Sequence, residues 1–117
     1  MMLSNLLSPA TESSPIPTAR QIDNIKEVAD AINSKGLGMK AIKMEGFTPR
    51  ILGVFPDVVA EIKGGTLRIF EKFSPDDALT YGASTIRAYD ENAVSITIYF
   101  KEGGMVILQF VAGRNLQ

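Results

Sequence analysis

The chain contains no cysteine, no histidine and no tryptophan among its 117 residues. The lack of cysteine excludes disulfide bridges, thiol nucleophiles and thiolate metal sites, and it removes the usual clue to the redox compartment. The lack of histidine excludes a Ser-His-acid relay and any zinc site with imidazole ligands. Acid–base chemistry would then depend on Asp, Glu, Lys or Tyr with strongly shifted pKa values, which a domain of this size rarely provides. We therefore expect a protein that is not an enzyme and that binds no cofactor or metal.

An excess of charge of one sign is also missing, since 12 basic side chains stand against 13 acidic ones. Proteins that bind a phosphate backbone normally carry a basic excess, so nucleic acid is not an expected partner. No apolar run reaches the roughly 18 residues that span a bilayer, so no transmembrane segment is expected. The length suits one domain of about 100 residues with a modest core.

Residues 1–17 have the composition of a disordered leader or linker. They contain three prolines, five Ser or Thr residues and no Lys or Arg. The short cluster of Leu3, Leu6 and Leu7 lacks the cationic flank and the length of an export signal. We expect a single α+β domain over residues 18–117, because Thr18 and Gln21 form the Ser/Thr-x-x-Glu/Gln pattern that caps the start of a helix.

One amphipathic helix should follow this cap and end near Gly36. Its apolar side chains recur at three- and four-residue spacing at Ile22, Ile25, Val28, Ala29 and Ile32. A strand is expected over residues 37–45. Segment 46–57 is rich in glycine and proline, which predicts an ordered loop anchored in the core by Phe47, Leu52 and Phe55.

A tight hairpin is the clearest local feature. Gly64 and Gly65 can take the positive φ angles of a two-residue turn between strands 58–63 and 66–73. This turn length places Ile62 opposite Leu67 and Glu61 opposite Arg68. The Glu61–Arg68 ion pair should support the register and contribute about 0–1 kcal/mol.

Residues 74–77, Ser-Pro-Asp-Asp, have the order of side chains found at the start of a helix. A second helix is therefore expected from Ser74 to about Tyr89. Asp76 and Asp77 could also ligate a hard cation. Capping explains both carboxylates without a ligand, so no metal site is assigned to them.

The chain should end in a second hairpin, with strands 94–100 and 105–112. A three-residue loop over 102–104 would place Phe100 opposite Val106 and Ile98 opposite Leu108. The complete element order is then helix, three strands, helix and two strands. This order predicts an α+β fold with a mainly antiparallel five-stranded sheet and two helices packed on one face.

The outward side of this last hairpin is the first candidate binding surface. Tyr99 lies there with Thr97 and Gln109, a mixture typical of surfaces that contact other proteins. Ordinary solvent-facing strand residues would have the same composition. We expect a non-catalytic module that contacts a protein partner, or a second copy of itself as a homodimer, through this face.

A pocket between segment 46–57 and the sheet is the second candidate. Arg50 or Arg68 would orient an anionic small molecule in it. The same pocket could serve a carboxylate-dependent enzyme. The remaining alternative is a structural domain with no site of its own.

Several short motifs resemble those of a group of small uncharacterised bacterial exported or lipoprotein-like domains. They are Lys-Gly at 35–36, Gly-Phe-Thr-Pro at 46–49, Gly-Thr-Leu-Arg-Ile-Phe-Glu at 65–71, Tyr-Phe-Lys-Glu-Gly-Gly-Met-Val-Ile-Leu at 99–108 and Gly-Arg-Asn at 113–115. The resemblance implies an α+β fold, no defined activity, and an exported or cell-envelope location. In that group a lipid-anchored cysteine precedes a polar linker. This chain has a polar segment at 8–17 and no cysteine, so a cytoplasmic location is the alternative if the written start is genuine.

Overall fold

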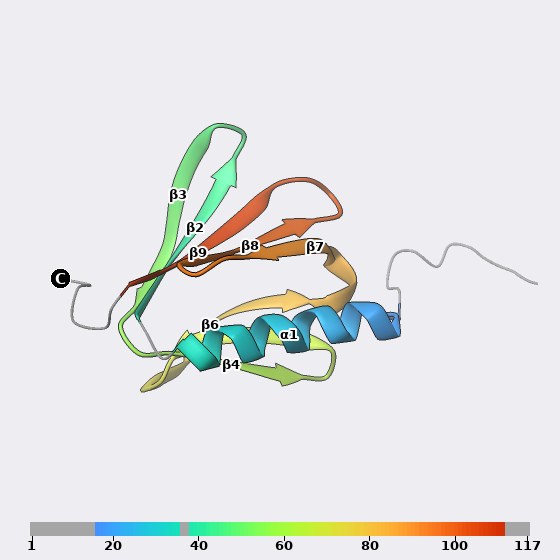
Figure 1. Cartoon of the computed structure of the whole chain (residues 1–117), viewed down its shortest axis with the longest axis horizontal. Helices are drawn as coiled ribbons and strands as arrows, with labels where there is room; N and C mark the ends of the chain where they lie inside the picture. The colour runs from blue at the N-terminus through green and yellow to red at the C-terminus, as the bar shows by residue number, and fades with distance from the viewer. Residues whose placement is uncertain (1–15, 36–37, 112–117) are drawn as a thin grey trace, which may run out of the picture.

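The structure, a computed structural model, describes residues 16–35 and 38–111 and has an α+β fold (Figure 1). Its elements in chain order are α1 (Ala19–Lys35), β2 (Gly38–Glu45), β3 (Thr48–Phe55), β4 (Val58–Lys63), β5 (Thr66–Glu71), β6 (Ser74–Gly82), the short 3-10 helix η2 (Ala83–Thr85), β7 (Ile86–Glu91), β8 (Ser95–Phe100) and β9 (Met105–Val111). The strands form two antiparallel sheets, a five-stranded sheet in the order β3-β2-β9-β8-β7 and a three-stranded sheet in the order β4-β5-β6. Most of the predicted leader, residues 1–15, lies outside the described residues, as does the predicted helix end at Gly36.

The predicted cap and apolar stripe of the first helix are confirmed. The backbone N–H of Gln21 donates to Thr18 Oγ1 at 3.1 Å, and the backbone N–H of Thr18 donates to Gln21 Oε1 at 2.8 Å. These reciprocal bonds satisfy amide groups that have no partner within the helix. The stripe buries Ile25, Val28 and Ile32.

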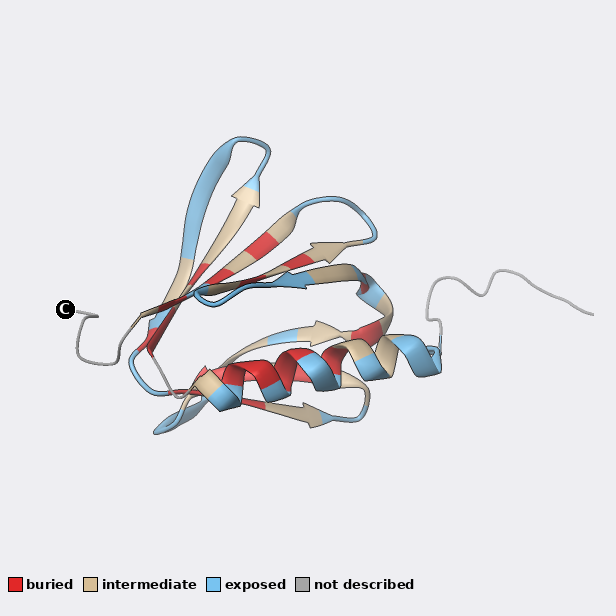
Figure 2. Ribbon diagram, viewed as in Figure 1, coloured by how far each residue is buried: buried red, intermediate tan, exposed pale blue. Residues whose placement is uncertain are grey.

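Helix α1 lies against both sheets and fills one side of the gap between them. It contacts β4 and β5 of the three-stranded sheet, and it also contacts η2 and β7. Figure 2 shows buried residues concentrated where α1 and the sheets meet, whereas the β2–β3 hairpin extends away from the core to an exposed tip. The core therefore forms around one helix between two sheets.

Polar contacts to both sheets also fix this helix in place. The Asn33 side chain bonds to edge strand β4 twice: its amide nitrogen donates to the Ala60 carbonyl at 2.8 Å, and its amide oxygen accepts from the Ala60 N–H at 2.9 Å. On the other side of the gap, the Tyr89 hydroxyl on β7 donates to the Glu27 carboxylate. The helix is thus hydrogen-bonded to a strand of each sheet.

The predicted β4–β5 hairpin is confirmed in turn and register. Gly64 and Gly65 have φ angles of 60° and 77°, which residues other than glycine rarely adopt. Ile62 pairs with Leu67 and Glu61 pairs with Arg68. Arg68 and Glu61 also form the predicted ion pair.

The predicted second helix is wrong, because residues 74–91 form β6, η2 and β7 instead. β6 pairs with β5, placing Leu79 opposite Ile69 and Tyr81 opposite Leu67. These apolar residues alternate with Thr80, which is the period of a strand, and pairing supplies β5 with a second neighbour. Tertiary pairing therefore outweighs the local capping signal, and Asp76 lies exposed on a strand.

The predicted loop over residues 46–57 is also wrong, since most of it is strand β3 paired with β2. Phe47 is not a core anchor, because it is 100% exposed at the tip of the β2–β3 hairpin. Phe55 is buried as expected, and Leu52 packs partly buried against the core. Pro49 is accommodated because β3 is an edge strand, where a missing N–H donor costs little.

The last hairpin forms, but its predicted register is wrong by two residues. Ile98 pairs with Val106 and Ile96 pairs with Leu108. Phe100 and Gly104 are joined by a hydrogen bond of 3.3 Å, so the loop occupies residues 101–103 rather than 102–104. A slip of two residues leaves every side chain on its predicted face. The buried face of this hairpin is as expected. The prediction of one five-stranded sheet with two helices is corrected, because the described residues form one α-helix and two sheets.

Replacing Asn33 with Ala should destabilise the fold, because both polar groups of Ala60 lose their partner at once. We expect the free energy of unfolding to fall by about 1–3 kcal/mol. Urea denaturation checks this value, with Asp30→Ala as the control because Asp30 is exposed on the same helix. Equal stability of the Asn33→Ala variant and the wild type would show that the contact does not hold α1 to β4.

Candidate functional site

The five-stranded sheet has an outer face, which is the side turned away from α1 and from the three-stranded sheet. Cross-strand pairing arranges its side chains in three rows that run across the sheet. The first row is Ile51, Ile42, Ile107, Thr97 and Asp90; the second is Pro49, Met44, Met105, Tyr99 and Ala88; the third is Val54, Lys40, Gln109 and Ser95. We call this set the outer face.

The first two rows are mainly apolar over three neighbouring strands. Ile51 on β3 is 61% exposed, and Val54 in the third row is 47% exposed. Ile42 lies between Ile51 and Ile107 and is only half-buried. An antiparallel sheet with one solvated face normally presents polar side chains there, so the apolar composition of these rows is unusual for a face in contact with water.

Tyr99 lies at the polar end of the outer face. Its hydroxyl donates to Asp90 Oδ2 at 3.0 Å, and the Arg87 guanidinium carbon lies 5.5 Å from the centre of its ring. Thr97 pairs with Ile107 in the neighbouring row, and Gln109 is exposed between Lys40 and Ser95. The structure thus brings Tyr99, Thr97 and Gln109 together on one face.

The β3 part of the outer face was missed by sequence reasoning. Ile51 and Val54 fall in the segment predicted as a loop, in which no sheet face could be assigned to their side chains. The signal that could have found them is the alternation of Pro49 and Ile51 with Arg50 and Leu52, which fits a strand with two different faces.

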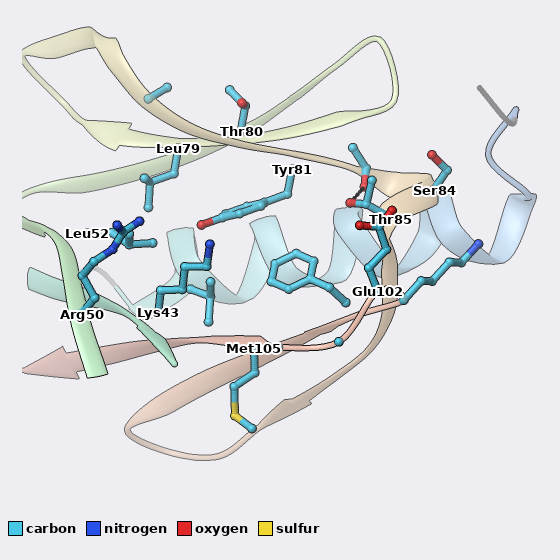
Figure 3. Close-up of a pocket in the computed structure, with 17 residues that line it drawn as sticks. Lys43, Arg50, Leu52, Leu79, Thr80, Tyr81, Ser84, Thr85, Glu102 and Met105 are labelled. Carbon is cyan, nitrogen blue, oxygen red and sulfur yellow. Dashed lines mark hydrogen bonds between the residues drawn. The ribbon is translucent and has the colours of Figure 1, made fainter. Parts of the chain in front are cut away.

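A cleft of about 1100 Å³ opens on the inner side of the same sheet. β6 forms one wall, and β3, β2 and the β8–β9 turn form the other (Figure 3). Its apolar lining includes Leu52, Leu79, Tyr81, Phe100 and Val106. The rings of Tyr81 and Phe100 meet across the two sheets with centroids 5.3 Å apart. Figure 3 shows α1 behind the cleft, so the opening lies on the side of the gap opposite the helix.

Charged side chains line the rim of this cleft. Lys43 on β2 and Arg50 on β3 are cross-strand partners. Both lie near the Glu45 carboxylate, with N–O distances of 3.7 Å for Lys43 and 3.9 Å for Arg50. Lys101 and Glu102 line the cleft at the β8–β9 turn.

Arg50 and Arg68, the two cations predicted for a pocket, do not come together. Arg50 lines the cleft, whereas Arg68 forms its ion pair with Glu61 and donates to the Pro75 carbonyl at 2.9 Å. The structure therefore leaves Arg50 as the predicted cation beside the cleft, with Lys43 as a partner that sequence reasoning did not single out.

The three tyrosines of the chain share a raised pKa. Burial in the cleft wall raises the pKa of Tyr81 to about 12. The hydrogen bond to Glu27 raises the pKa of Tyr89 to about 12, and the hydrogen bond to Asp90 raises the pKa of Tyr99. All three hydroxyl groups are therefore neutral donors at physiological pH.

A spectrophotometric titration should find no phenol that ionises with the ordinary pKa of about 10. A folded-state pKa above the unfolded value gives stability that is present below pH 10 and is lost as the pH rises toward 12. We therefore expect the free energy of unfolding to fall between pH 10 and 12, and to fall less steeply in a Tyr89→Phe variant. A tyrosine that titrates near pH 10 in the folded protein would contradict the burial of Tyr81 or the hydrogen bonds of Tyr89 and Tyr99.

Within residues 16–35 and 38–111, no group of three or more acidic side chains is placed to hold a metal ion. Helix α1 has 17 residues and one charged side. Among the described residues, no helix has the length and hydrophobicity that a bilayer-crossing segment requires.

Comparison with known protein families, with curated proteins and with solved structures finds no significant match to this chain. The resemblance to exported or lipoprotein-like domains therefore stays a prediction.

Proposed function

We propose that this protein is a non-catalytic interaction module that contacts another protein chain through the outer face. The observation that supports the proposal most directly is the apolar surface that runs over β3, β2 and β9, with Ile51 and Val54 exposed to solvent. Single exposed apolar residues are common on proteins. Adjacent rows of them on a sheet face are characteristic of a surface that a partner covers.

A second copy of this chain is the partner that fits the face best. A sheet face packs well on another sheet face, as in a β-sandwich, where the apolar sides of both interdigitate. The outer face carries Lys40 at one side and Asp90 at the other, so two copies related by a two-fold axis offer each other complementary charges. The net charge of −1 adds little repulsion between copies.

Tyr99 is the expected anchor of this contact at the β8 side. Its ring is held by Asp90 and Arg87, so little side-chain freedom is lost when a partner packs on it. Aromatic side chains with such fixed orientation are frequent among the residues that dominate binding energy.

The test is to place a charge at the exposed end of the apolar rows, at Ile51 on β3. The wild type should sediment as a dimer, and Ile51→Lys should weaken dimerisation at least tenfold, because a lysine ammonium would have to be buried without a partner. Phe73→Lys is the matched control, since Phe73 is 77% exposed in the β5–β6 turn, away from the outer face. Sedimentation equilibrium gives the dissociation constants, and urea denaturation verifies that both variants fold.

A Tyr99→Ala variant gives a second reading at the polar end of the face, where we also expect dissociation with the fold intact. A wild-type protein that stays monomeric at high concentration would overturn self-association through this face. Equal dimerisation of the Ile51→Lys and Phe73→Lys variants would place the contact elsewhere.

A further inference from the structure

We propose that the cleft between β6 and the five-stranded sheet binds a small amphipathic anion, namely a carboxylate with an apolar chain. The apolar chain would lie between Leu79 and Tyr81 on one wall and Leu52 and Phe100 on the other. The carboxylate would lie beside Lys43 and Arg50. This site lies on the opposite side of the sheet from the outer face, so it does not depend on the proposed contact between chains.

The apolar lining of the cleft favours a ligand with an apolar chain. Leu52, Leu79, Tyr81 and Phe100 pack on the core yet keep part of their surface exposed. Figure 3 shows Leu79 and Tyr81 extending from β6 toward Leu52 on the facing wall, while Met105 points to the other side of the sheet. The inner faces of packed sheets are normally dry. Helix α1 buries the apolar side chains of the facing sheets only on its own side of the gap, and an apolar ligand chain would bury those on the other side.

The choice of an anion follows from the charges at the rim. Lys43 and Arg50 are like charges placed directly opposite each other on paired strands, an arrangement that is unfavourable without a counter-ion. Glu45 is the carboxylate near both, at 3.7 and 3.9 Å. These distances are longer than the roughly 2.8 Å of a strong charge-assisted hydrogen bond. The single Glu45 carboxylate neutralises only one of the two cations, so a net positive charge remains beside Lys43 and Arg50.

The remaining polar groups of the cleft do not reverse this preference. Lys101 and Glu102 at the β8–β9 turn balance each other in charge. Tyr81 adds a neutral hydroxyl, because its pKa is raised to about 12. Charge selection therefore depends on Lys43 and Arg50, and a guanidinium can hold a carboxylate through two parallel hydrogen bonds.

The cleft has room for a ligand with a chain of about 8–12 carbons. Its volume of about 1100 Å³ slightly exceeds the range of roughly 300–1000 Å³ typical of small-molecule sites. The cleft is open to solvent along one side, so such a ligand would lie in it lengthwise with its carboxylate at the rim.

The experiment uses decanoate as the probe, titrated into the full chain by calorimetry below its micelle concentration. Decyltrimethylammonium, with an alkyl chain only one carbon longer and the opposite charge, is the ligand control. We expect decanoate to bind at least tenfold more tightly than the cation. The double variant Lys43→Met and Arg50→Met should lose at least tenfold in decanoate affinity, whereas Glu45→Gln should gain several-fold because the competing carboxylate is removed.

Two further variants separate this site from its surroundings. Lys63→Met removes an exposed lysine in the β4–β5 hairpin, outside the cleft, and should leave decanoate binding unchanged. Ile51→Lys should also bind decanoate like the wild type, because Ile51 points to the outer face. If the Ile51→Lys variant fails to bind decanoate, the ligand lies on the outer face and the cleft site is overturned. This conclusion holds whatever the substitution does to dimerisation.

Absence of decanoate binding, or equal binding of decanoate and decyltrimethylammonium, would also overturn the proposal. Weaker binding by the Glu45→Gln variant would contradict the role given to Glu45 as the competing carboxylate. Urea denaturation of each variant confirms that altered affinity does not reflect unfolding.

Discussion

The packing of α1 into one side of the gap between two sheets is the constraint on which the structure depends. The chain crosses between the sheets at the β3–β4 turn and at η2. Ile25 and Ile32 of the helix are fully buried in the core that both sheets share. At about 25 cal/mol per Å² of apolar surface removed from water, such side chains dominate the stabilisation of this arrangement. Asn33 and Tyr89 then fix the helix to β4 and β7 by hydrogen bonds.

Both candidate sites follow from this arrangement. A single helix can fill only one side of the gap, so the other side is left open as the cleft beside Tyr81 and Phe100. Among the described residues, α1 contacts β7 on the inner side of the five-stranded sheet, and no element packs on the outer face. Domains usually bury each apolar sheet face against another element. The outer face and the cleft are therefore the two places where a partner or a ligand would complete the packing.

Local signals correctly predicted those parts of the fold whose conformation depends on residues that are close in the sequence. The cap at Thr18 and the turn at Gly64 and Gly65 have strong conformational preferences of their own, and both predictions are confirmed. The helix predicted from Ser74 failed because its capping pattern competes with a strand pairing that depends on distant β5. The outer side of the last hairpin was identified from alternation alone, since a two-residue slip preserves the face. Its extension onto Ile51 was not predictable, because it requires the pairing of β3 with β2.

One nuclear Overhauser spectrum of the backbone tests this account most directly, because both proposed sites depend on two strand pairings. The pairing of β5 with β6 builds one wall of the cleft, and the pairing of β2 with β9 assembles the outer face. The account predicts cross-strand contacts between the backbones of Ile69 and Leu79 and between those of Ile42 and Ile107. Helical contacts between residues three apart over 74–82, or the absence of contacts between β2 and β9, would contradict it.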